Sequence, residues 1–356
     1  MPKPTALSIG DLAGGAADIE ALAEDGSIVD PLMIVELDRG GVSETELSRA
    51  VERARGCDRV LIGTTNGVVS DALVSLAEAL DLTLAHGSGG LRCAVEAADP
   101  ESEAMALRRN AEVAPQAALV LAQVLRIGES LPVRQALDVE SLAYSTLLAG
   151  PGFARWLAAR GERPEPPSRP GETVIIRRYG GTLHLTLNRP ERRNAHSRDL
   201  RDALVAGLRV AELDDSVAAV VLDGNGPSFC SGGDLDEFGT ALDLTTAHLV
   251  RTRAGAARPL HALRDRLTAR IHGHCVGAGI ELPAFAGRVV ADPGTVMRLP
   301  ELEMGLIPGA GGTVSFPRRI GRWRTAYMVL SGEPVSAAFA LAWGLVDGIE
   351  PVIPEP

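Results

Sequence analysis

Two glutamates beside glycine-rich segments are the residues of this chain that best suit catalysis. Glu281 follows the loop CVGAGI (275–280), and Glu301 lies between Pro300 and the stretch GLIPGAGGT (305–313). Glycine loops can expose backbone N–H groups that hold a developing oxyanion. A pair of carboxylates beside them can move protons. The arrangement predicts chemistry at a carbon next to a carbonyl group.

The elements that must position these loops follow an alternating pattern. Residues 173–178 and 182–187 are strand-like, and residues 197–211 predict a helix that Ser197 caps. The apolar run 217–222 is typical of a strand buried on both faces. A third glycine motif, SFCSGGDL (228–235), comes after it. Alternation of strand and helix predicts an α/β fold with a parallel sheet.

Several motifs in a fixed order resemble the crotonase (enoyl-CoA hydratase/isomerase) superfamily. They are LTLNRPERRNA (185–195), FCSGGDL (229–235), the two glutamate segments, and AWGLVD (342–347). The resemblance covers nearly all of residues 173–350. It implies a crotonase-like core, a ββα superhelix, in the C-terminal half of the chain.

The resemblance also implies roles for particular residues. The oxyanion donors would be the backbone N–H groups of Gly233 and Ala278, and the acid/base pair would be Glu281 and Glu301. Alanine at 278 keeps the donor, because the donor is a backbone group. The segment after it is expected to begin a helix whose dipole adds to anion stabilisation. Retention of both glutamates favours hydration over isomerisation.

Contacts with an acyl-CoA substrate are implied in the same way. They fall on Arg192, Arg193, Ala195, Ser231, Asp234, Leu235, Gly277 and Arg298. Arg192 or Arg193 would pair with phosphate oxygens, or else lie on a solvated turn. Arg298 would lower the proton affinity of Glu301 or meet an acidic acyl group if it points inward, and would be surface charge if it points outward. His196 is expected to be structural.

Composition limits the other classes of function. The chain is 46% hydrophobic and 23% charged, with a net charge of −11, which disfavours binding to nucleic acid or to anionic membranes. The four cysteines show no metal-type spacing, and no P-loop or dinucleotide fingerprint occurs. No apolar run reaches membrane-spanning length. We therefore expect a cytoplasmic protein without a metal, and no cofactor except the coenzyme A of its substrate.

A proline-rich segment, residues 161–171, predicts a linker between two parts. Residues 172–356 would be the catalytic core. Residues 1–160 contain a weak internal repeat, because 32–39 can be aligned with 183–189, and 59–67 with 220–226. We interpret this part as a degenerate crotonase-like half without catalytic loops. Generic α/β similarity is the alternative.

The N-terminal part also predicts a helical cover for the site. Crotonase cores are followed by a helical tail, whereas this sequence ends soon after AWGLVD. Residues 101–160 resemble such a tail, with helices expected around 110–126, 133–148 and 151–161. We expect them to pack over the core of the same chain or of a partner. Members of the superfamily are commonly trimers or paired trimers, so a homo-oligomer is expected.

The leading hypothesis is a lyase, an enoyl-CoA hydratase that adds water reversibly to a 2-enoyl-CoA thioester in fatty acid metabolism. Another crotonase-type reaction on an acyl-CoA, such as isomerisation, hydrolysis or decarboxylation, stays open. So does a non-catalytic acyl-CoA-binding subunit. The sequence motifs do not specify the length or polarity of the acyl chain.

Overall fold

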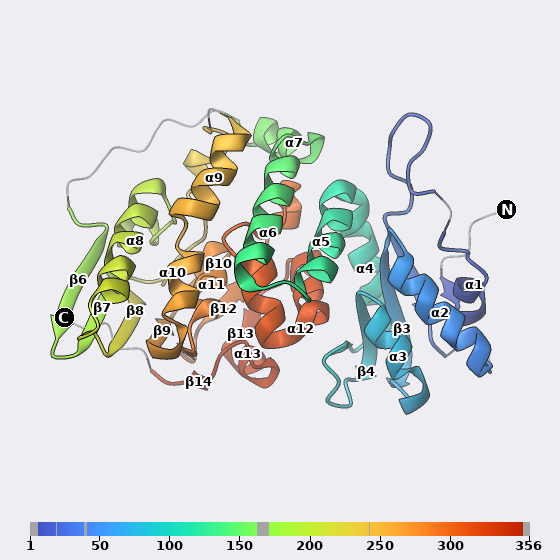
Figure 1. Ribbon diagram of the computed structural model, residues 1–356. Coiled ribbons are helices and arrows are strands. Elements are labelled where there is room, and N and C mark those ends of the chain that lie inside the picture. Colours follow the sequence, from blue (N-terminus) through green and yellow to red (C-terminus); the bar gives the residue numbers. More distant parts are fainter. Residues whose placement is uncertain (1–5, 19, 39–40, 162–170, 242, 352–356) are drawn as a thin grey trace. The chain divides into compact units, whose positions relative to one another are not determined.

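The computed structural model describes residues 6–18, 20–38, 41–161, 171–241 and 243–351. Two compact units divide the chain (Figure 1). The first contains Met1–Ser130 and Ile320–Ser331, and the second contains Leu131–Arg319 and Gly332–Pro356. Most of the predicted linker, residues 162–170, lies outside the described residues. The predicted division into 1–160 and 172–356 therefore stays a prediction.

A five-stranded parallel sheet forms the centre of the first unit. Its order is β1-β2-β3-β4-β5, with bounds Leu7–Ser8, Leu32–Glu36, Val60–Val68, Leu82–Gly87 and Ala94–Glu96. The helices are α1 (Ile9–Ala13), α2 (Glu44–Gly56), α3 (Val74–Ala79), α4 (Pro100–Val113) and α5 (Pro115–Gly128), with a 3₁₀ turn, η1 (Asp71–Leu73). The strands and helix predicted within 32–67 are thus present. The degenerate ancestry of this part stays a prediction.

The single helix expected around residues 110–126 is wrong. Two helices, α4 and α5, meet at Ala114, whose backbone is not helical (φ −128°, ψ 61°). Pro115 causes the break, because proline disfavours helical geometry in the residue before it and lacks the N–H that would continue the ladder. Proline suits the first position of a new helix, and Pro115 begins α5 there.

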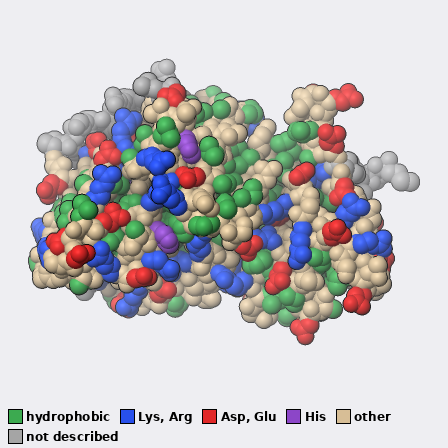
Figure 2. All heavy atoms as spheres, in the orientation of Figure 1, with side chains coloured by type: hydrophobic (Ala, Val, Ile, Leu, Met, Phe, Trp, Pro, Cys, Tyr) green, Lys and Arg blue, Asp and Glu red, His purple; other side chains and the backbone are tan. Residues whose placement is uncertain are grey.

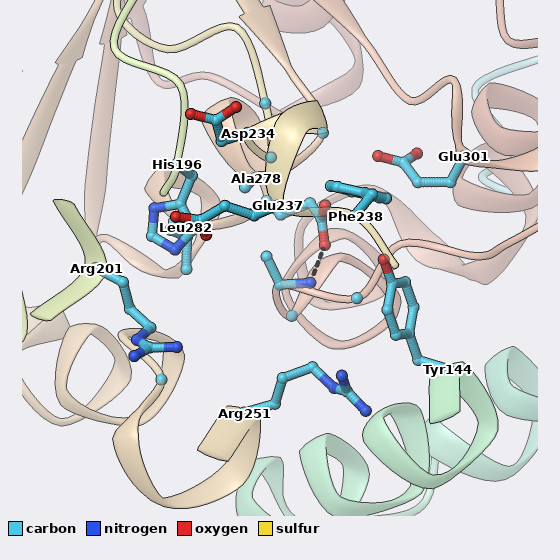
Figure 3. Close-up of a pocket in the computed structure, with 18 of the residues that line it drawn as sticks. Tyr144, His196, Arg201, Asp234, Glu237, Phe238, Arg251, Ala278, Leu282 and Glu301 are labelled. Carbon is cyan, nitrogen blue, oxygen red and sulfur yellow. Dashed lines mark hydrogen bonds between the residues drawn. The ribbon is translucent and has the colours of Figure 1, made fainter. Parts of the chain in front are cut away.

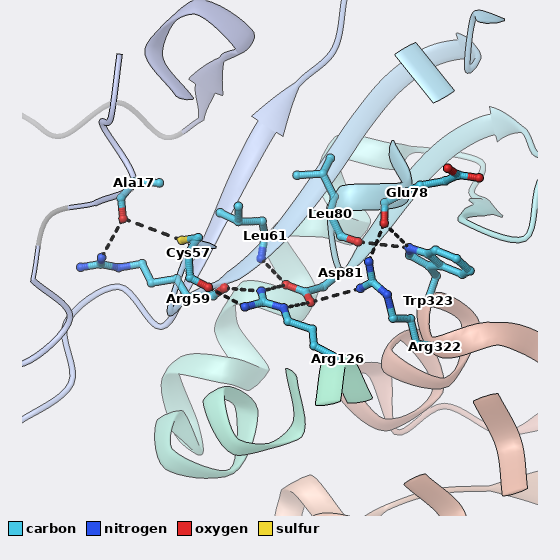
Figure 4. A network of polar contacts seen from close by, with 10 residues as sticks. All are labelled: Ala17, Cys57, Arg59, Leu61, Glu78, Leu80, Asp81, Arg126, Arg322 and Trp323. Carbon is cyan, nitrogen blue, oxygen red and sulfur yellow. Dashed lines mark hydrogen bonds and ion pairs between the residues drawn. The ribbon is translucent and has the colours of Figure 1, made fainter. Parts of the chain in front are cut away.

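In the first unit, the buried side chain of Asp81 lies between two arginines that come from other elements (Figure 4). Asp81 is 3% exposed, and its oxygens accept hydrogen bonds from Arg126 Nε (2.9 Å) and from the Leu61 backbone N–H (2.8 Å). Arg322 Nη1 lies 3.6 Å from the same carboxylate. Arg126 Nη2 also donates to the carbonyl of Arg59, at 2.8 Å. The buried negative charge is therefore paired and fully hydrogen-bonded.

The second unit has a six-stranded sheet in the order β14-β11-β9-β8-β7-β6. The bounds in that order are Gly348–Ile349, Arg288–Ala291, Leu267–Ile271, Ala219–Gly224, Thr182–Leu187 and Val174–Tyr179. All neighbouring pairs are parallel except β6 and β7, which form an antiparallel hairpin. A smaller sheet, β10-β12-β13, contains His274–Val276, Val296–Arg298 and Val335–Ser336. The predicted α/β fold with a largely parallel sheet is confirmed.

The helices of the second unit begin before the sheet in the sequence. They are α6 (Val133–Leu148), α7 (Pro151–Arg160), α8 (Arg198–Leu213), α9 (Leu244–Ala254), α10 (Ala257–Ala262), α11 (Ala278–Glu281), α12 (Gly312–Ser331) and α13 (Ala337–Trp343), with 3₁₀ turns η2 (Pro190–Arg192), η3 (Leu235–Glu237), η4 (Arg264–Arg266), η5 (Pro283–Phe285) and η6 (Glu301–Met304). Non-helical backbone at Gly321 (φ 84°) divides α12, and its residues from Ile320 to Ser331 belong to the first unit. Ser197 caps α8 as predicted, because its side chain accepts from the Leu200 N–H. Of the expected covering helices, α6 and α7 belong to this unit, whereas α4 and α5 belong to the first.

Candidate active site

A cavity of about 480 Å³ in the second unit brings the predicted catalytic residues together (Figure 3). Gly233, Ala278, Glu281 and Glu301 all line it. The other walls come from α6, α7, α9 and α10, which contribute polar and apolar side chains. The volume is in the range of small-molecule sites.

A parallel bridge between Cys230 and Cys275 aligns the two loops that carry Gly233 and Ala278. The Val276 N–H donates to the Cys230 carbonyl at 3.1 Å, which fixes the register. Gly233 and Ala278 each lie three residues beyond the bridge, so they occur at matching positions on adjacent loops. Neither N–H group has a hydrogen-bond acceptor among the described residues. Two backbone donors on the cavity wall are thus available to a ligand.

Two glycines with positive φ allow the loops to approach closely. Gly232 has φ +99°, and a Cβ there would lie 2.9 Å from the Val276 carbonyl oxygen. Gly277 has φ +50°, and a Cβ there would lie 2.5 Å from Glu301 Oε1. A side chain at either position would clash or strain the backbone. Gly232 therefore lets the two loops approach each other, and Gly277 leaves room for the carboxylate of Glu301.

Glu281 is 2% exposed and held in one orientation. Its Oε2 accepts hydrogen bonds of 2.8 Å from the N–H groups of Ala310 and Gly312. Burial raises the pKa of Glu281 to about 7, and the two N–H donors oppose that rise. Helix α11, which ends at Glu281, has only one turn, and Pro283 begins the next short turn, η5. The helix dipole expected behind Ala278 is correspondingly short.

Glu301 is 7% exposed, and its Oε2 is buried without a hydrogen-bond partner among the described residues. Its Oε1 and that of Glu281 both lie near Gly277, at 2.5 and 3.7 Å from the position that a Cβ would take there. Burial raises the pKa of Glu301 well above its usual value, and the neighbouring charge of Glu281 raises it further. Two acids that titrate abnormally and face one point can exchange protons with a ligand.

A third buried glutamate, Glu140, was missed by the sequence analysis. It comes from α6, is 2% exposed, and accepts hydrogen bonds from the N–H groups of Gly311 (2.8 Å) and Thr313 (3.0 Å) and from Thr313 Oγ1 (2.7 Å). The N–H groups of residues 310–313 thus alternate between Glu281 and Glu140. Burial raises the pKa of Glu140 to about 8, and the charge of Glu281 adds to the rise. The available signal was an acid on the apolar stripe of a helix, between Leu137 and Tyr144.

Three further side chains face the cavity from other elements (Figure 3). Tyr144 extends from α6, Arg251 from α9, and His196 from the loop before α8. Burial lowers the pKa of His196 to about 4, so the ring is neutral near pH 7. His196 was expected to be structural, but it lines the cavity. Tyr144 and Arg251 were not singled out from the sequence.

Helix α7 covers the loop after Gly233 through aromatic contacts. The ring of Phe238 lies 6.4 Å from that of Phe153 and 5.9 Å from that of Trp156, measured between centroids. Arg160 forms an ion pair of 2.7 Å with Asp236. These contacts connect the helix to the segment that follows the predicted oxyanion donor.

The predicted substrate contacts divide into two sets. Ser231, Asp234, Leu235 and Gly277 line the cavity, whereas Arg192, Arg193, Ala195 and Arg298 do not. Arg192 is held by Asp234 (2.6 Å) and Asp236 (2.8 Å), and Arg193 is exposed. Arg298 bonds to Glu303 at 2.5 Å and donates to the carbonyl of Gly332, and its side chain is 39% exposed, so it has the outward orientation.

Other kinds of site find no support in the described ranges. No cluster of metal-type ligands occurs there. None of the helices in those ranges combines the length and the apolarity needed to cross a bilayer. All four cysteines are buried free thiols.

Comparison with known proteins agrees with the motifs. The sequence profile of the family "Enoyl-CoA hydratase/isomerase" matches residues 177–354. The chain is 39% identical over 178 residues to 2,3-dehydroadipyl-CoA hydratase of Escherichia coli (strain K12), an alignment that covers 50% of this chain and 69% of that protein. It is 31% identical to a probable enoyl-CoA hydratase of Rhizobium meliloti (strain 1021), over 50% of this chain and 68% of the relative. The enoyl-CoA hydratase structure from Thermoplasma volcanium GSS1 is 30% identical, with a TM-score of 0.46, over 51% of this chain and 72% of that one.

The order of the motifs, the parallel sheet and the profile match together define the class. The chain belongs to the enoyl-CoA hydratase/isomerase family, that is, to the crotonase superfamily.

Proposed function

We propose that this protein is an enoyl-CoA hydratase, a lyase that adds water reversibly to the double bond of a 2-enoyl-CoA thioester. One observation carries the proposal: two buried glutamates, 281 and 301, face one point of a cavity that also exposes two unpaired backbone N–H groups. The hydratases among the relatives support the same reaction.

The N–H groups of Gly233 and Ala278 would bind the thioester oxygen. When water adds to the β-carbon, negative charge collects on that oxygen, and both donors stabilise it more strongly than they stabilise the ground state. The effect of one such donor is about 3 kcal/mol in a well-studied acyl-transfer site. The oxyanion function is thus assigned to backbone atoms that the Cys230–Cys275 bridge holds in register.

The two glutamates would divide the proton transfers. Two N–H donors favour the carboxylate form of Glu281, whereas Oε2 of Glu301 has none among the described residues. Protonation is therefore more favourable at Glu301, whose pKa is raised well above its usual value, than at Glu281, whose pKa is about 7. Glu281 takes a proton from water as general base, and Glu301 delivers its proton to the α-carbon as general acid.

The coenzyme A part of the substrate would lie outside the cavity. The family resemblance assigns the segment 188–195 to the pantetheine and phosphates. Because Asp234 and Asp236 already hold Arg192, the exposed Arg193 is the better placed of the two for a phosphate. Cytoplasmic location, the homo-oligomer and the absence of any other cofactor stay predictions.

The test follows loss of the conjugated enoyl thioester absorbance with wild-type protein and the variants Glu281→Gln and Glu301→Gln. Each substitution keeps the side-chain shape and removes the acid, so we expect turnover to fall by about 10²- to 10⁴-fold. If either variant keeps full activity, the assigned roles are wrong. A wild-type protein that binds acyl-CoA without turnover would instead be a binding subunit, and product identity separates hydration from isomerisation, hydrolysis or decarboxylation.

A further inference from the structure

Arginine side chains gather over α9 and α10, at the end of the cavity formed by these helices and α6 (Figure 2). Two of them, Arg251 and Arg258, line the cavity itself. They are a separate set from Arg192 and Arg193, which do not line it. Their hydrogen bonds therefore show what kind of group the far end of the cavity can receive.

Arg251 is positioned from α6 without a carboxylate partner. Its Nε donates to Ser141 Oγ (3.0 Å), and its Nη2 donates to the Ser141 carbonyl (3.3 Å) and to Ser145 Oγ. Its guanidinium lies 4.9 Å from the centre of the Tyr144 ring. No described carboxylate forms an ion pair with it, and Nη1 has no hydrogen bond among the described residues. The guanidinium is thus fixed in place while part of its donor edge stays free.

Arg258 adds a second incompletely satisfied cation at the same wall. Its Nη2 bonds to Asp138 at 2.5 Å, but its Nε is buried without a hydrogen-bond partner among the described residues. Burial lowers the pKa of Arg258, the charge of Asp138 opposes that change, and the charges of Arg134 and Arg253 add to it. Positive charges that are removed from water require anionic partners. Asp138 pairs with Nη2 of Arg258, but it leaves the Nε donor without an acceptor among the described residues.

We propose that this wall binds a carboxylate at the far end of the acyl chain, so that the preferred substrates are acyl-CoA thioesters with a terminal carboxyl group. Arg251 is the specificity-determining residue, and Arg258 supports it. Guanidinium groups bind carboxylates through paired, charge-assisted hydrogen bonds. The inference rests on the proposed function for the orientation of the thioester, with the carbonyl at Gly233 and Ala278 and the chain directed toward α9.

The experiment measures binding of two saturated, unreactive thioesters of equal chain length by calorimetry, one with a terminal carboxylate and one with a terminal methyl. We compare wild type, Arg251→Gln and Arg209→Gln. Arg209 is exposed on α8 and does not line the cavity, so its substitution removes the same charge without touching the site. Arg251→Gln should weaken binding of the carboxylate ligand by about ten- to a hundredfold and leave the methyl ligand nearly unchanged. Arg209→Gln should change neither.

Three results would overturn the inference. If Arg251→Gln weakens binding of both ligands equally, then Arg251 either contacts coenzyme A or only joins α6 to α9. In the second case the variant would also lose thermal stability. If wild type binds the methyl ligand as tightly as the carboxylate ligand, the wall has no role in selection. If neither ligand binds, the proposed function fails as well. Because the ligands are unreactive, loss of turnover in the glutamate variants neither supports nor contradicts the inference.

Discussion

Two buried carboxylate centres of this molecule differ in what surrounds them. Asp81, in the first unit, lies between Arg126 and Arg322 and accepts a backbone hydrogen bond (Figure 4). In the second unit, Glu281 accepts two backbone N–H hydrogen bonds, Oε2 of Glu301 has no hydrogen-bond partner among the described residues, and the pKa of each acid is raised. A buried acid matched by cations holds a fold together. A buried acid without cations is poised to transfer protons, at a cost to stability.

The largest effect is expected from Glu301→Gln. Turnover should fall by about 10²- to 10⁴-fold, while the protein stays folded, because the substitution removes an ionisable group that burial disfavours. Steady-state kinetics and thermal denaturation measure the two effects. Glu212→Gln, on the exposed face of α8, is the control and should alter neither. A large loss of stability in Glu301→Gln would contradict the distinction between the centres.

Asp81→Asn should show the opposite behaviour. Removing one partner of a buried ion pair costs about 3–5 kcal/mol, because Arg126 is left without its counter-charge and Arg322 keeps only Glu129. Hydrogen exchange measured by mass spectrometry should reveal faster exchange in strands β3 and β4. Asp18→Asn breaks an ion pair with Arg53 whose side chains are 38% and 50% exposed, and should cost about 0–1 kcal/mol. Equal costs for the two substitutions would remove the basis of the comparison.

Glu140→Gln should alter the dependence of stability on pH. The pKa of Glu140 is raised to about 8, so the folded state keeps a proton that the unfolded state loses above about pH 4.5. Its contribution to stability therefore falls as pH rises from about 5 to 8. The variant has no carboxyl group to titrate at this position. Between pH 5 and pH 8 its free energy of unfolding should therefore rise by about 2–4 kcal/mol relative to that of wild type.

The measurement is denaturant unfolding at pH 5 and pH 8 for both proteins. If the free energy of unfolding changes by the same amount between the two pH values in wild type and in Glu140→Gln, then Glu140 is not a protonated acid in the folded state. The alkaline limb of the rate profile, which the general acid Glu301 sets, should also move to lower pH in the variant, because the charge of Glu140 raises the pKa of Glu301. Glu212→Gln again serves as the control.

The smallest effect is expected from His196→Gln. Burial holds the pKa of His196 at about 4, so its ring does not change charge between pH 5 and pH 8. Substrate affinity can change, since His196 lines the cavity, but the midpoints of the rate profile should stay where the glutamates place them. A shift of either midpoint would mean that the histidine titrates with the acids.

The sequence predicted those features that depend on local patterns. The strands and helix from 173 to 224, the cap at Ser197 and the two glycine loops all follow from periodicity, capping and positive-φ geometry. The break at Ala114 was missed although Pro115 signalled it. The helical pattern continues on both sides of the proline, whereas proline restricts the backbone of the residue before it.

The remaining parts of the site depend on contacts between distant segments. Glu140 bonds to N–H groups 171 and 173 residues away, and Arg251 is fixed by serines 110 and 106 residues before it. Hydrophobic periodicity places Glu140 on the inner face of α6 but does not reveal what it contacts there. Arg192 shows the same limit, because its pairing with Asp234 and Asp236 removes a donor that the motif alone offered to phosphate.

The hydrogen bonds between Glu140 and the loop at 311–313 have a consequence for protein synthesis. The helix that carries this acid is translated before that loop, which at the usual speed of a ribosome follows about 10 to 30 s later. During that interval the helix can pack against α7 and α9, but the carboxylate of Glu140 lacks its N–H donors. The carboxyl group of Glu140 stays exposed to water and ionised during this time. It becomes protonated only when the loop folds over it and buries it.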